Sequence, residues 1–449
     1  MTGPRTLSRT QSICPQCLQK LEAAYVLDND TVYMEKTCEV HGFFRTKTWH
    51  GRDSRQTWIK PKIPIEQRFH MTPEKKGCPF DCGLCPSHRQ HTCTAILEVT
   101  QNCNFHCAFC FAGSGLHQRF KDPSLDQIRS LLASVYAVSP GCNLQISGGE
   151  PTLRKDLPDI VAAAKKTGFE FIQLNTNGYI PAMDGGLLKS LKNEGLSSVF
   201  LQFDGVNDKV YETLRGRPLW EIKQKAVKNC IEHDIGVILV PTLVPGINVD
   251  QIGPVLLFAL DHAPGVRGVH FQPVSHFGRH PGPPKDSDRI TIPEILAEME
   301  SQTQNKFRRR DFRPSSCEHA LCSFNGKFLI LEDGTLSPLP ALGTNCCTPV
   351  PAEQGAKQAK ASVARQWGPP VNIREPHQPD AKDGLDRFIQ RSRTHMFSVS
   401  GMAFQDAWNI DLERLKGCCI HSIAPDGRLI PFCAYNLTGE NNTSLYRKP

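Results

Sequence analysis

The sequence predicts an α/β protein: a partial (β/α)6 barrel, preceded by a small metal-binding knuckle and followed by a cysteine-rich region. Two observations predict this fold. Between residues 95 and 275, short apolar runs alternate with segments whose apolar residues recur at helical spacing, as in parallel strands joined by helices. The chain also holds 19 cysteines among 449 residues, clustered at short spacings before, within and after that region.

Residues 1–60 form the first predicted domain, a knuckle of zinc-ribbon or rubredoxin type. Cys14 and Cys17 are followed, after alternating apolar residues, by Cys38 and His41. The C-x2-C…C-x2-H pattern is typical of a tetrahedral structural metal site. Zinc is the expected metal and iron the alternative. A metal-free hairpin is disfavoured because so short a segment buries little core.

Residues 61–94 form a second predicted segment, which holds Cys78, Cys82, Cys85 and Cys93. Four thiolates complete the ligand set of a cubane [4Fe–4S] cluster. We therefore interpret the segment as an auxiliary-cluster site, with a second zinc site as the alternative.

The barrel is predicted over residues 95–275. Strands are expected at 95–100, 143–147, 171–175, 198–203, 236–243 and 268–273, and helices near 125–137, 157–167, 186–194, 220–233 and 249–263. Six strands separated by helices fit an incomplete barrel, and an open doubly wound sheet is the alternative. In a parallel barrel the chemistry lies at the C-terminal ends of the strands.

A second cysteine run, Cys103-x3-Cys107-x2-Cys110, directly follows the first predicted strand. Three thiolates on one loop can hold three irons of a cubane cluster, which normally has four protein ligands. The fourth iron is then open to a small molecule. This spacing repeats that of Cys78, Cys82 and Cys85, but the earlier run precedes every barrel strand and has Cys93 as a fourth thiolate.

The second predicted strand ends in Gly148, Gly149, Glu150 and Pro151. Adjacent glycines let the backbone approach a ligand closely. The following carboxylate and the rigid proline provide an acceptor site that suits an ammonium group.

The triplet Cys103, Cys107 and Cys110, the aromatic Phe109 and the 148–151 turn together resemble the radical S-adenosylmethionine (SAM) superfamily. The resemblance implies that the open iron is chelated by the amino and carboxylate groups of SAM. Reduction of the cluster would cleave SAM to methionine and a 5′-deoxyadenosyl radical, which abstracts hydrogen from an unactivated C–H bond. The protein would orient the reactants, supply electrons and exclude water.

Other polar residues follow the later predicted strands. They are Asn175, Asn177, Gln202, Asp204 and Thr242. The resemblance implies that they hold the ribose and adenine of SAM. A structural role, as polar strand-end side chains bonded to the backbone, is equally open for each.

Residues 276–449 are predicted to form a C-terminal cluster and substrate region, with a flexible insertion at 351–383. The favoured ligands of a third cluster are Cys317, Cys322, Cys419 and Cys433, with Cys418 as an alternative to Cys419. Cys346 and Cys347 remain unassigned. The basic run at 308–313 could meet an anionic substrate group, although a solvated helix end is the commoner role.

Longer segments narrow the resemblance. CPFDCGLCPSHRQHTC, PSSCEHALCS and CIHSIAPDGRLIPFCAYN occur together with the N-terminal CPQC. This combination resembles the group that contains the class D methyltransferases, which methylate a hydroxymethyl-dihydropterin, and the archaeal tetraether lipid synthases. It implies methyl or methylene transfer to a small molecule such as a pterin, from a folate-like donor. Radical C–C coupling of lipid chains is the alternative within the group, and a multi-cluster electron-transfer protein is the alternative outside it.

Composition and charge indicate which kinds of partner and which compartment to expect. Apolar residues make up 39% and charged residues 22%, there is no apolar run of membrane-spanning length, and the first residues lack the apolar core of a signal peptide. Metal-ligating thiols require a reducing compartment, which predicts a cytoplasmic enzyme. The net charge of +7 is offset by ligating thiolates. The N-terminal knuckle shows no contiguous basic and aromatic face, so nucleic-acid binding is not expected. An electron donor such as a ferredoxin or flavodoxin is expected, and peripheral membrane contact stays open.

Overall fold

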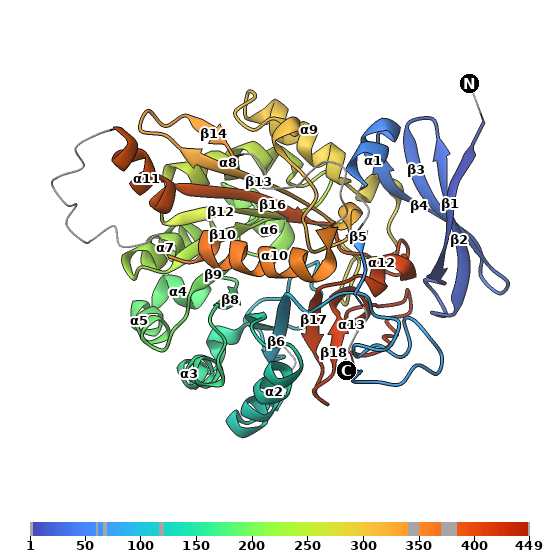
Figure 1. Cartoon of the computed structure of the whole chain (residues 1–449), viewed down its shortest axis with the longest axis horizontal. Helices are drawn as coiled ribbons and strands as arrows, with labels where there is room; N and C mark the ends of the chain where they lie inside the picture. The colour runs from blue at the N-terminus through green and yellow to red at the C-terminus, as the bar shows by residue number, and fades with distance from the viewer. Residues whose placement is uncertain are drawn as a thin grey trace.

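The computed structural model describes residues 3–59, 62–65, 70–115, 121–339, 350–369 and 384–447 (Figure 1). The N-terminal domain is a four-stranded antiparallel meander in the order β1-β2-β3-β4. Its strands are β1 (Arg5–Ile13), β2 (Lys20–Asp28), β3 (Thr31–Cys38) and β4 (Gly42–His50), and the short helix α1 (Arg52–Trp58) follows. It lies at one end of the molecule.

The six predicted barrel strands are present and pair in parallel as neighbours. They are β6 (Thr94–Thr100), β7 (Asn143–Gly148), β8 (Ile172–Thr176), β9 (Ser198–Gln202), β10 (Gly236–Val240) and β12 (Val266–Pro273). The expected strand at 236–243 is split, and its second part is β11 (Thr242–Leu243). All five residues of β10 are buried, as expected for a strand covered on both faces.

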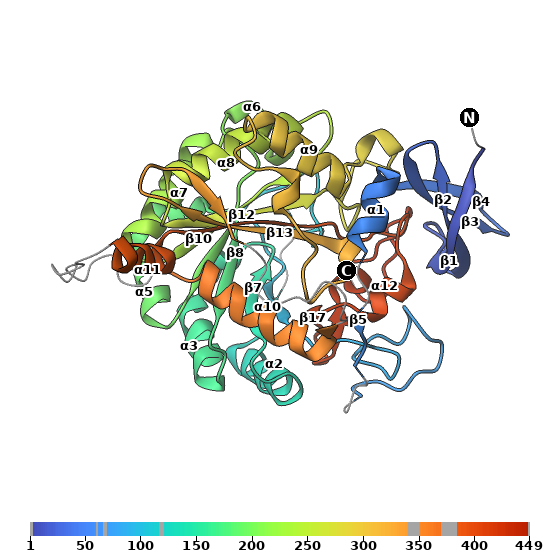
Figure 2. The ribbon, with the colours of Figure 1, turned by 45° about the horizontal axis from the view of Figure 1, so that its top comes forward.

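Helices connect these strands and lie outside the curved sheet (Figure 2). They are α2 (Leu125–Val138), α3 (Leu157–Thr167), α4 (Tyr179–Met183), α5 (Gly185–Asn193), α6 (Asp208–Arg215), α7 (Trp220–Glu232) and α8 (Ile252–Asp261). α6 was not expected, because its eight residues carry too few apolar positions to stand out in the sequence. Among the described helices, none combines the length and apolar character needed to cross a membrane.

The sheet continues beyond the predicted barrel on both sides, so the expected boundary at residue 275 does not separate two sheets. β16 (Met396–Met402) adds in parallel to β12, and β13 (Ser323–Ile330) and β14 (Leu336–Pro338) follow it. On the other edge, β17 (Ile420–Ile423) pairs with β6, and β18 (Leu429–Pro431) pairs with β17. The C-terminal region thereby covers sheet edges that would otherwise expose unpaired backbone groups.

The expectation of a flexible insertion at 351–383 is wrong for its first half. Residues Ala352–Trp367 form helix α10, which contacts β10, β12 and β16. Trp367 at its end packs against Phe200 and His270. The segment is rich in alanine, lysine, glutamine and arginine, which are strong helix formers; its polarity led to the wrong prediction. Residues 370–383 lie outside the described residues.

The remaining elements are short. They are β5 (Lys62–Ile63) paired with β15 (Val350–Pro351), and the helices α9 (Ile292–Gln302), α11 (Gly384–Thr394), α12 (Leu412–Lys416) and α13 (Phe432–Tyr435). Single 3-10 turns occur at Pro151–Leu153, Val249–Gln251, Asp286–Asp288, Arg309–Asp311 and Ala320–Cys322. Cys346 and Cys347 lie outside the described residues.

Candidate active site and metal centres

The loop that follows β6, here called the first-strand loop (101–115), carries Cys103, Cys107 and Cys110, all partly buried. It meets the double-glycine turn directly. The Gly149 amide donates to the Thr100 carbonyl at 2.8 Å, and the Glu150 amide donates to the Asn102 carbonyl at 2.8 Å. The two motifs, separate in the sequence, therefore form one surface at the C-terminal ends of β6 and β7.

Both glycines of this turn are required by space. A Cβ on Gly148 would lie 2.2 Å from the Thr100 carbonyl oxygen, and one on Gly149 would lie 2.2 Å from that of Asn102. Gly148 also has φ +144, which L side chains rarely adopt. The two glycines thus allow the turn to approach the first-strand loop closely. The expected approach to a ligand stays a prediction.

The Glu150 carboxylate is almost fully buried and is held from several sides. Oε1 accepts from the Thr152 amide at 3.0 Å, the Thr152 hydroxyl at 2.5 Å and the Thr176 hydroxyl at 2.8 Å, and Oε2 accepts from the Asn177 amide at 2.7 Å. Burial raises the pKa of Glu150, and the hydrogen bonds from these donors offset only part of that rise. The carboxylate therefore ties the turn to the end of β8, and only Oε2 has acceptor capacity left for a ligand.

Pro151 begins the 3-10 turn after Glu150, and Phe109 on the first-strand loop packs beside Val244 and Val274. At the end of β8, the Asn177 side-chain amide donates to Asn104 of the loop at 2.8 Å. The Asn175 side-chain oxygen is buried and has no hydrogen-bond partner among the described residues. An orphaned acceptor at a strand end fits a site completed by a ligand.

Asp204 lies in a buried ion pair rather than facing open space. Arg215 donates to its carboxylate through Nε at 2.7 Å and Nη2 at 2.8 Å, and the Thr242 amide donates at 3.1 Å. Gln202 donates to the same carboxylate and accepts from Lys223 Nζ at 2.7 Å. Gln202, Asp204 and Thr242 are thus brought together, in a network that holds Arg215.

Arg215 in turn lies beside the first-strand loop. Burial alone would lower the pKa of its guanidinium, but Asp204 and the Cys107 thiol raise it. Burial raises the pKa of the Cys103 thiol to about 12. A thiol ligates a metal only after it loses its proton, and the positive charge of the bound ion stabilises the thiolate.

The segment after β12 also binds the first-strand loop, through Arg279. Arg279 donates through Nε to the Cys107 carbonyl at 2.7 Å and through Nη2 to the Ser114 carbonyl at 2.7 Å. The backbones of Arg279 and Cys110 also exchange hydrogen bonds at 2.9 and 3.0 Å. Sequence reasoning missed Arg215 and Arg279; the only signal was the Gly278-Arg279-His280 run at the predicted end of the barrel.

The N-terminal ligand atoms converge as predicted. The three sulfurs of Cys14, Cys17 and Cys38 and a ring nitrogen of His41 all lie within 4.8 Å of one another. The Cys14 and Cys38 sulfurs lie 3.5 and 3.4 Å from His41 Nδ1. This compact tetrad fits a single tetrahedral ion.

Two family models match the chain, "Radical SAM superfamily" over residues 97–259 and "HMPTM N-terminal zinc ribbon domain" over residues 6–50. The 7,8-dihydro-6-hydroxymethylpterin dimethyltransferase of Methanocaldococcus jannaschii is 32% identical over 471 aligned positions, covering 95% of this chain and 93% of that protein. The chain belongs to the radical SAM superfamily. Within it, the chain belongs to the family of that relative.

More distant similarities each cover less than half of this radical SAM enzyme. The GTP 3′,8-cyclase of Limosilactobacillus fermentum is 29% identical over 184 residues, 40% of this chain and 54% of that protein. Among solved structures, Streptococcus suis SuiB bound to precursor peptide SuiA has a TM-score of 0.41 at 14% identity, over 49% of this chain and 46% of that one. Native anSMEcpe with bound AdoMet has a TM-score of 0.37 at 15% identity, over 47% and 60%.

The residues at the ends of β6–β8 fit the groups that this superfamily uses. Three thiols on one short loop suit a [4Fe–4S] cluster with one open iron. The orphaned Asn175 oxygen near the end of β8 suits a polar ligand. The radical SAM fold and the N-terminal zinc ribbon expected from the sequence are confirmed.

The earlier cysteine run lies on a second loop, here called the upstream loop (77–88). Cys78, Cys82 and Cys85 line one small pocket together with His88 and Pro431. His88 Nε2 lies 3.2 Å from Nε2 of His421 on β17, so one ring donates to the other. Neither histidine was singled out from the sequence as a neighbour of this loop.

The predicted fourth ligand of that loop, Cys93, lies elsewhere. Its sulfur is bonded to that of Cys317, and the Cys419 sulfur lies within 4.8 Å of both. The cause is strand pairing: the Cys93 amide donates to the Cys419 carbonyl at 2.8 Å where β6 and β17 begin. Both expected ligand sets are therefore wrong. Cys93 does not join Cys78, Cys82 and Cys85, and Cys317 and Cys419 lie with Cys93 and not with Cys322 and Cys433.

The other C-terminal cysteines have separate partners. Arg414 Nη2 donates to the Cys322 sulfur at 3.0 Å, and the Gln405 amide donates to the Cys433 sulfur at 3.3 Å. The Cys418 thiol donates to the Ile420 carbonyl at 3.2 Å. None of the three belongs to the compact Cys93/Cys317/Cys419 group.

Proposed function

We propose that this radical SAM enzyme transfers a methyl or methylene unit to a small pterin, of the class on which its relative acts. The observation that carries the proposal is the alignment with the 7,8-dihydro-6-hydroxymethylpterin dimethyltransferase over 95% of this chain. Because the alignment includes the ribbon and the C-terminal region as well as the barrel, it reaches beyond the shared radical-generating part.

In this proposal Cys103, Cys107 and Cys110 hold the [4Fe–4S] cluster that binds SAM. When bound and reduced, that cluster supplies the electron that cleaves SAM to methionine and a 5′-deoxyadenosyl radical. The backbone at Gly148 and Gly149 lets the amino-acid end of SAM come close, with Glu150 fixing the turn.

The remaining strand-end residues orient the ligand or its supports. Asn175 and Asn177 contact the sugar and base, which supplies the partner that Asn175 lacks among the described residues. Gln202, Asp204 and Thr242 act indirectly, by holding Arg215 beside Cys107. The positive charge of Arg215 there favours the reduced cluster, since reduction adds negative charge.

The other cysteine groups serve as further metal centres. Cys14, Cys17, Cys38 and His41 hold zinc, with iron as the alternative, and the upstream loop holds an auxiliary [4Fe–4S] cluster. After reduction of the Cys93–Cys317 bond, Cys93, Cys317 and Cys419 supply ligands of one more centre. A ferredoxin or flavodoxin delivers electrons, and the enzyme works in the reducing cytoplasm, where these thiols stay available.

The test is anaerobic reconstitution with iron and sulfide, followed by dithionite, SAM, a hydroxymethyl-dihydropterin and a folate-type methylene donor. We expect 5′-deoxyadenosine and a pterin heavier by one or two methylene units, measured by mass spectrometry. Deoxyadenosine without any change in the pterin, together with coupled chains when lipid is offered, would favour lipid coupling instead.

A further inference from the structure

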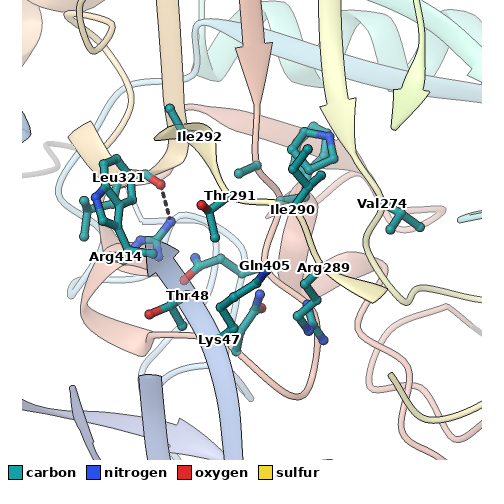
Figure 3. Close-up of a pocket in the computed structure, with 15 residues that line it drawn as sticks. Lys47, Thr48, Val274, Arg289, Ile290, Thr291, Ile292, Leu321, Gln405 and Arg414 are labelled. Carbon is teal, nitrogen blue, oxygen red and sulfur yellow. Dashed lines mark hydrogen bonds between the residues drawn. The ribbon is translucent and has the colours of Figure 1, made fainter. Parts of the chain in front are cut away.

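A pocket lies at the C-terminal ends of β12 and β16, where strand β4 of the zinc ribbon covers it (Figure 3). Its walls come from several separate parts of the chain. Lys47 and Thr48 belong to β4, Arg289 and Thr291 precede α9, Gln405 follows β16, and Arg414 lies on α12. The ribbon is thus a wall of this pocket as well as a metal-binding domain.

All charged side chains that line the pocket are cations: Lys47, Arg289 and Arg414. Their acidic partners Glu294 and Asp406 are not among the described lining residues. Figure 3 shows Arg414 and Arg289 on opposite sides, with Gln405 and Lys47 between them. The pocket therefore offers an anion several donors and, among its described lining residues, no competing carboxylate.

Two of these cations have unused donors. Arg289 and Arg414 are 7% and 9% exposed, and the Nε of each is buried without a hydrogen-bond partner among the described residues. The other Arg289 donors hold Asp406 at 2.9 and 3.0 Å, and Arg414 Nη2 holds the Leu321 carbonyl at 3.1 Å. A buried donor left without a partner is destabilising, so both of these lining guanidinium groups favour an acceptor within reach of Nε.

The free space in the pocket is about 50 Å3. That holds a few water molecules, or one carboxylate- or phosphate-sized group, and is too small for a pterin ring. Val274 on its wall packs in the same apolar cluster as Phe109 of the first-strand loop. The pocket wall and the first-strand loop therefore share one apolar cluster.

We propose that this pocket, here called the cation pocket, binds the acidic group of the one-carbon donor. The name of the ligand rests on the proposed function, because a folate-type methylene donor carries its negative charge on a tail distant from the reactive pterin. The anion site itself rests on the three cations and the two unused guanidinium donors. A carboxylate and a phosphate share this chemistry, and the test separates them.

The test is isothermal titration of the reconstituted holoenzyme with glutarate and, separately, with inorganic phosphate. We expect one of the two to bind, and Lys47→Ala to weaken its binding about tenfold, the loss of one charge-assisted hydrogen bond. Arg45→Ala is the matched control: Arg45 lies two residues earlier on β4, pairs with Asp28 and is outside the pocket. It should bind the anion as the unmodified protein does.

A second variant fills the pocket without removing a charge. Ala403 lines it, and Ala403→Leu should abolish anion binding in a protein that retains its zinc, iron and unfolding midpoint. Binding of neither anion, or equal binding by all variants, would overturn the inference. Because this titration needs no SAM cleavage and no pterin, failure of the pocket and failure of the proposed reaction give different results.

Discussion

The first-strand loop and the upstream loop have the same cysteine spacing and different surroundings. The first follows a barrel strand, and its three cysteines are partly exposed beside the double-glycine turn. The second precedes the barrel and buries Cys82 at 5% exposure, and its last residue, His88, contacts the buried His421 of β17. The spacing sets how many thiols come together, whereas the neighbouring strand ends determine whether a ligand can reach the metal they hold.

The largest expected difference between the loops concerns SAM cleavage. Cys107→Ala should reduce 5′-deoxyadenosine formation to background, because it removes one of three cluster ligands, while the ribbon keeps its metal. Cys82→Ala, the matched change in the upstream loop, should lose iron but still cleave SAM at a measurable rate. Iron and zinc analysis with product quantification checks both. If Cys107→Ala still cleaves SAM and Cys82→Ala does not, the SAM-binding cluster belongs to the upstream loop. Cleavage that persists in Cys107→Ala alone would also contradict its assignment to the first-strand loop.

The stability of the barrel should depend on pH through a buried histidine that belongs to neither loop. His270 is a buried residue of β12 that contacts Ser400 of β16, and burial lowers its pKa from 6.5 to about 4. A histidine kept neutral by the fold contributes stability that is complete above pH 6.5 and is lost as the pH falls to about 4. The shift corresponds to roughly 3 kcal/mol.

Urea denaturation across that pH range checks this expectation. His270→Gln should flatten the pH dependence of the free energy of unfolding, with no change in SAM cleavage per folded molecule. An unchanged slope in the variant would assign the acid sensitivity to other groups.

The double-glycine turn should be the next most sensitive feature, and only for the first-strand loop. In Gly149→Ala the new Cβ would meet the Asn102 carbonyl at 2.2 Å and displace turn or loop. Misplacement of this size costs about 100-fold in rate, and we expect that loss in SAM cleavage with the iron content preserved. Gly282→Ala is the control, because a Cβ there meets nothing within 4 Å.

Much of this contrast could be predicted from the sequence, because its parts are local. The ribbon tetrad and both cysteine runs come from short stretches, and the barrel strands are distinct apolar runs. The Cys93/Cys317/Cys419 group could not be predicted in this way, since 224 residues separate Cys93 from Cys317. Cys419 reaches Cys93 because β17 pairs beside β6, and no local pattern specifies which edge of the sheet a late strand covers.

Arg279 shows the same limit at a single side chain. Its guanidinium reaches the carbonyls of Cys107 and Ser114 only because the chain after β12 crosses over the first-strand loop. A lone arginine in an irregular segment gives no sign of that in the sequence. α10 shows the opposite error, in which a polar composition concealed a regular helix.

The smallest expected effect concerns the contact between Arg279 and the first-strand loop. Arg279→Lys retains the charge but cannot span both carbonyls, so SAM cleavage should fall about tenfold, the equivalent of about 1.4 kcal/mol. If Arg279 positions the loop, the electron paramagnetic resonance (EPR) signal of the reduced SAM-binding cluster should also broaden or shift. An unaltered signal and rate would limit Arg279 to general stability. The upstream loop should be unaffected in either case.

The most direct test of the account uses a holoenzyme without the upstream ligands, Cys78→Ala/Cys82→Ala/Cys85→Ala, with ribbon metal content as the folding control. The EPR spectrum of the reduced protein is recorded before and after SAM is added. We predict that SAM still changes the spectrum, because the cluster that binds it is held by Cys103, Cys107 and Cys110. A spectrum that SAM leaves unchanged, in a protein with its ribbon metal in place, would contradict the assignment of the SAM site to the first-strand loop.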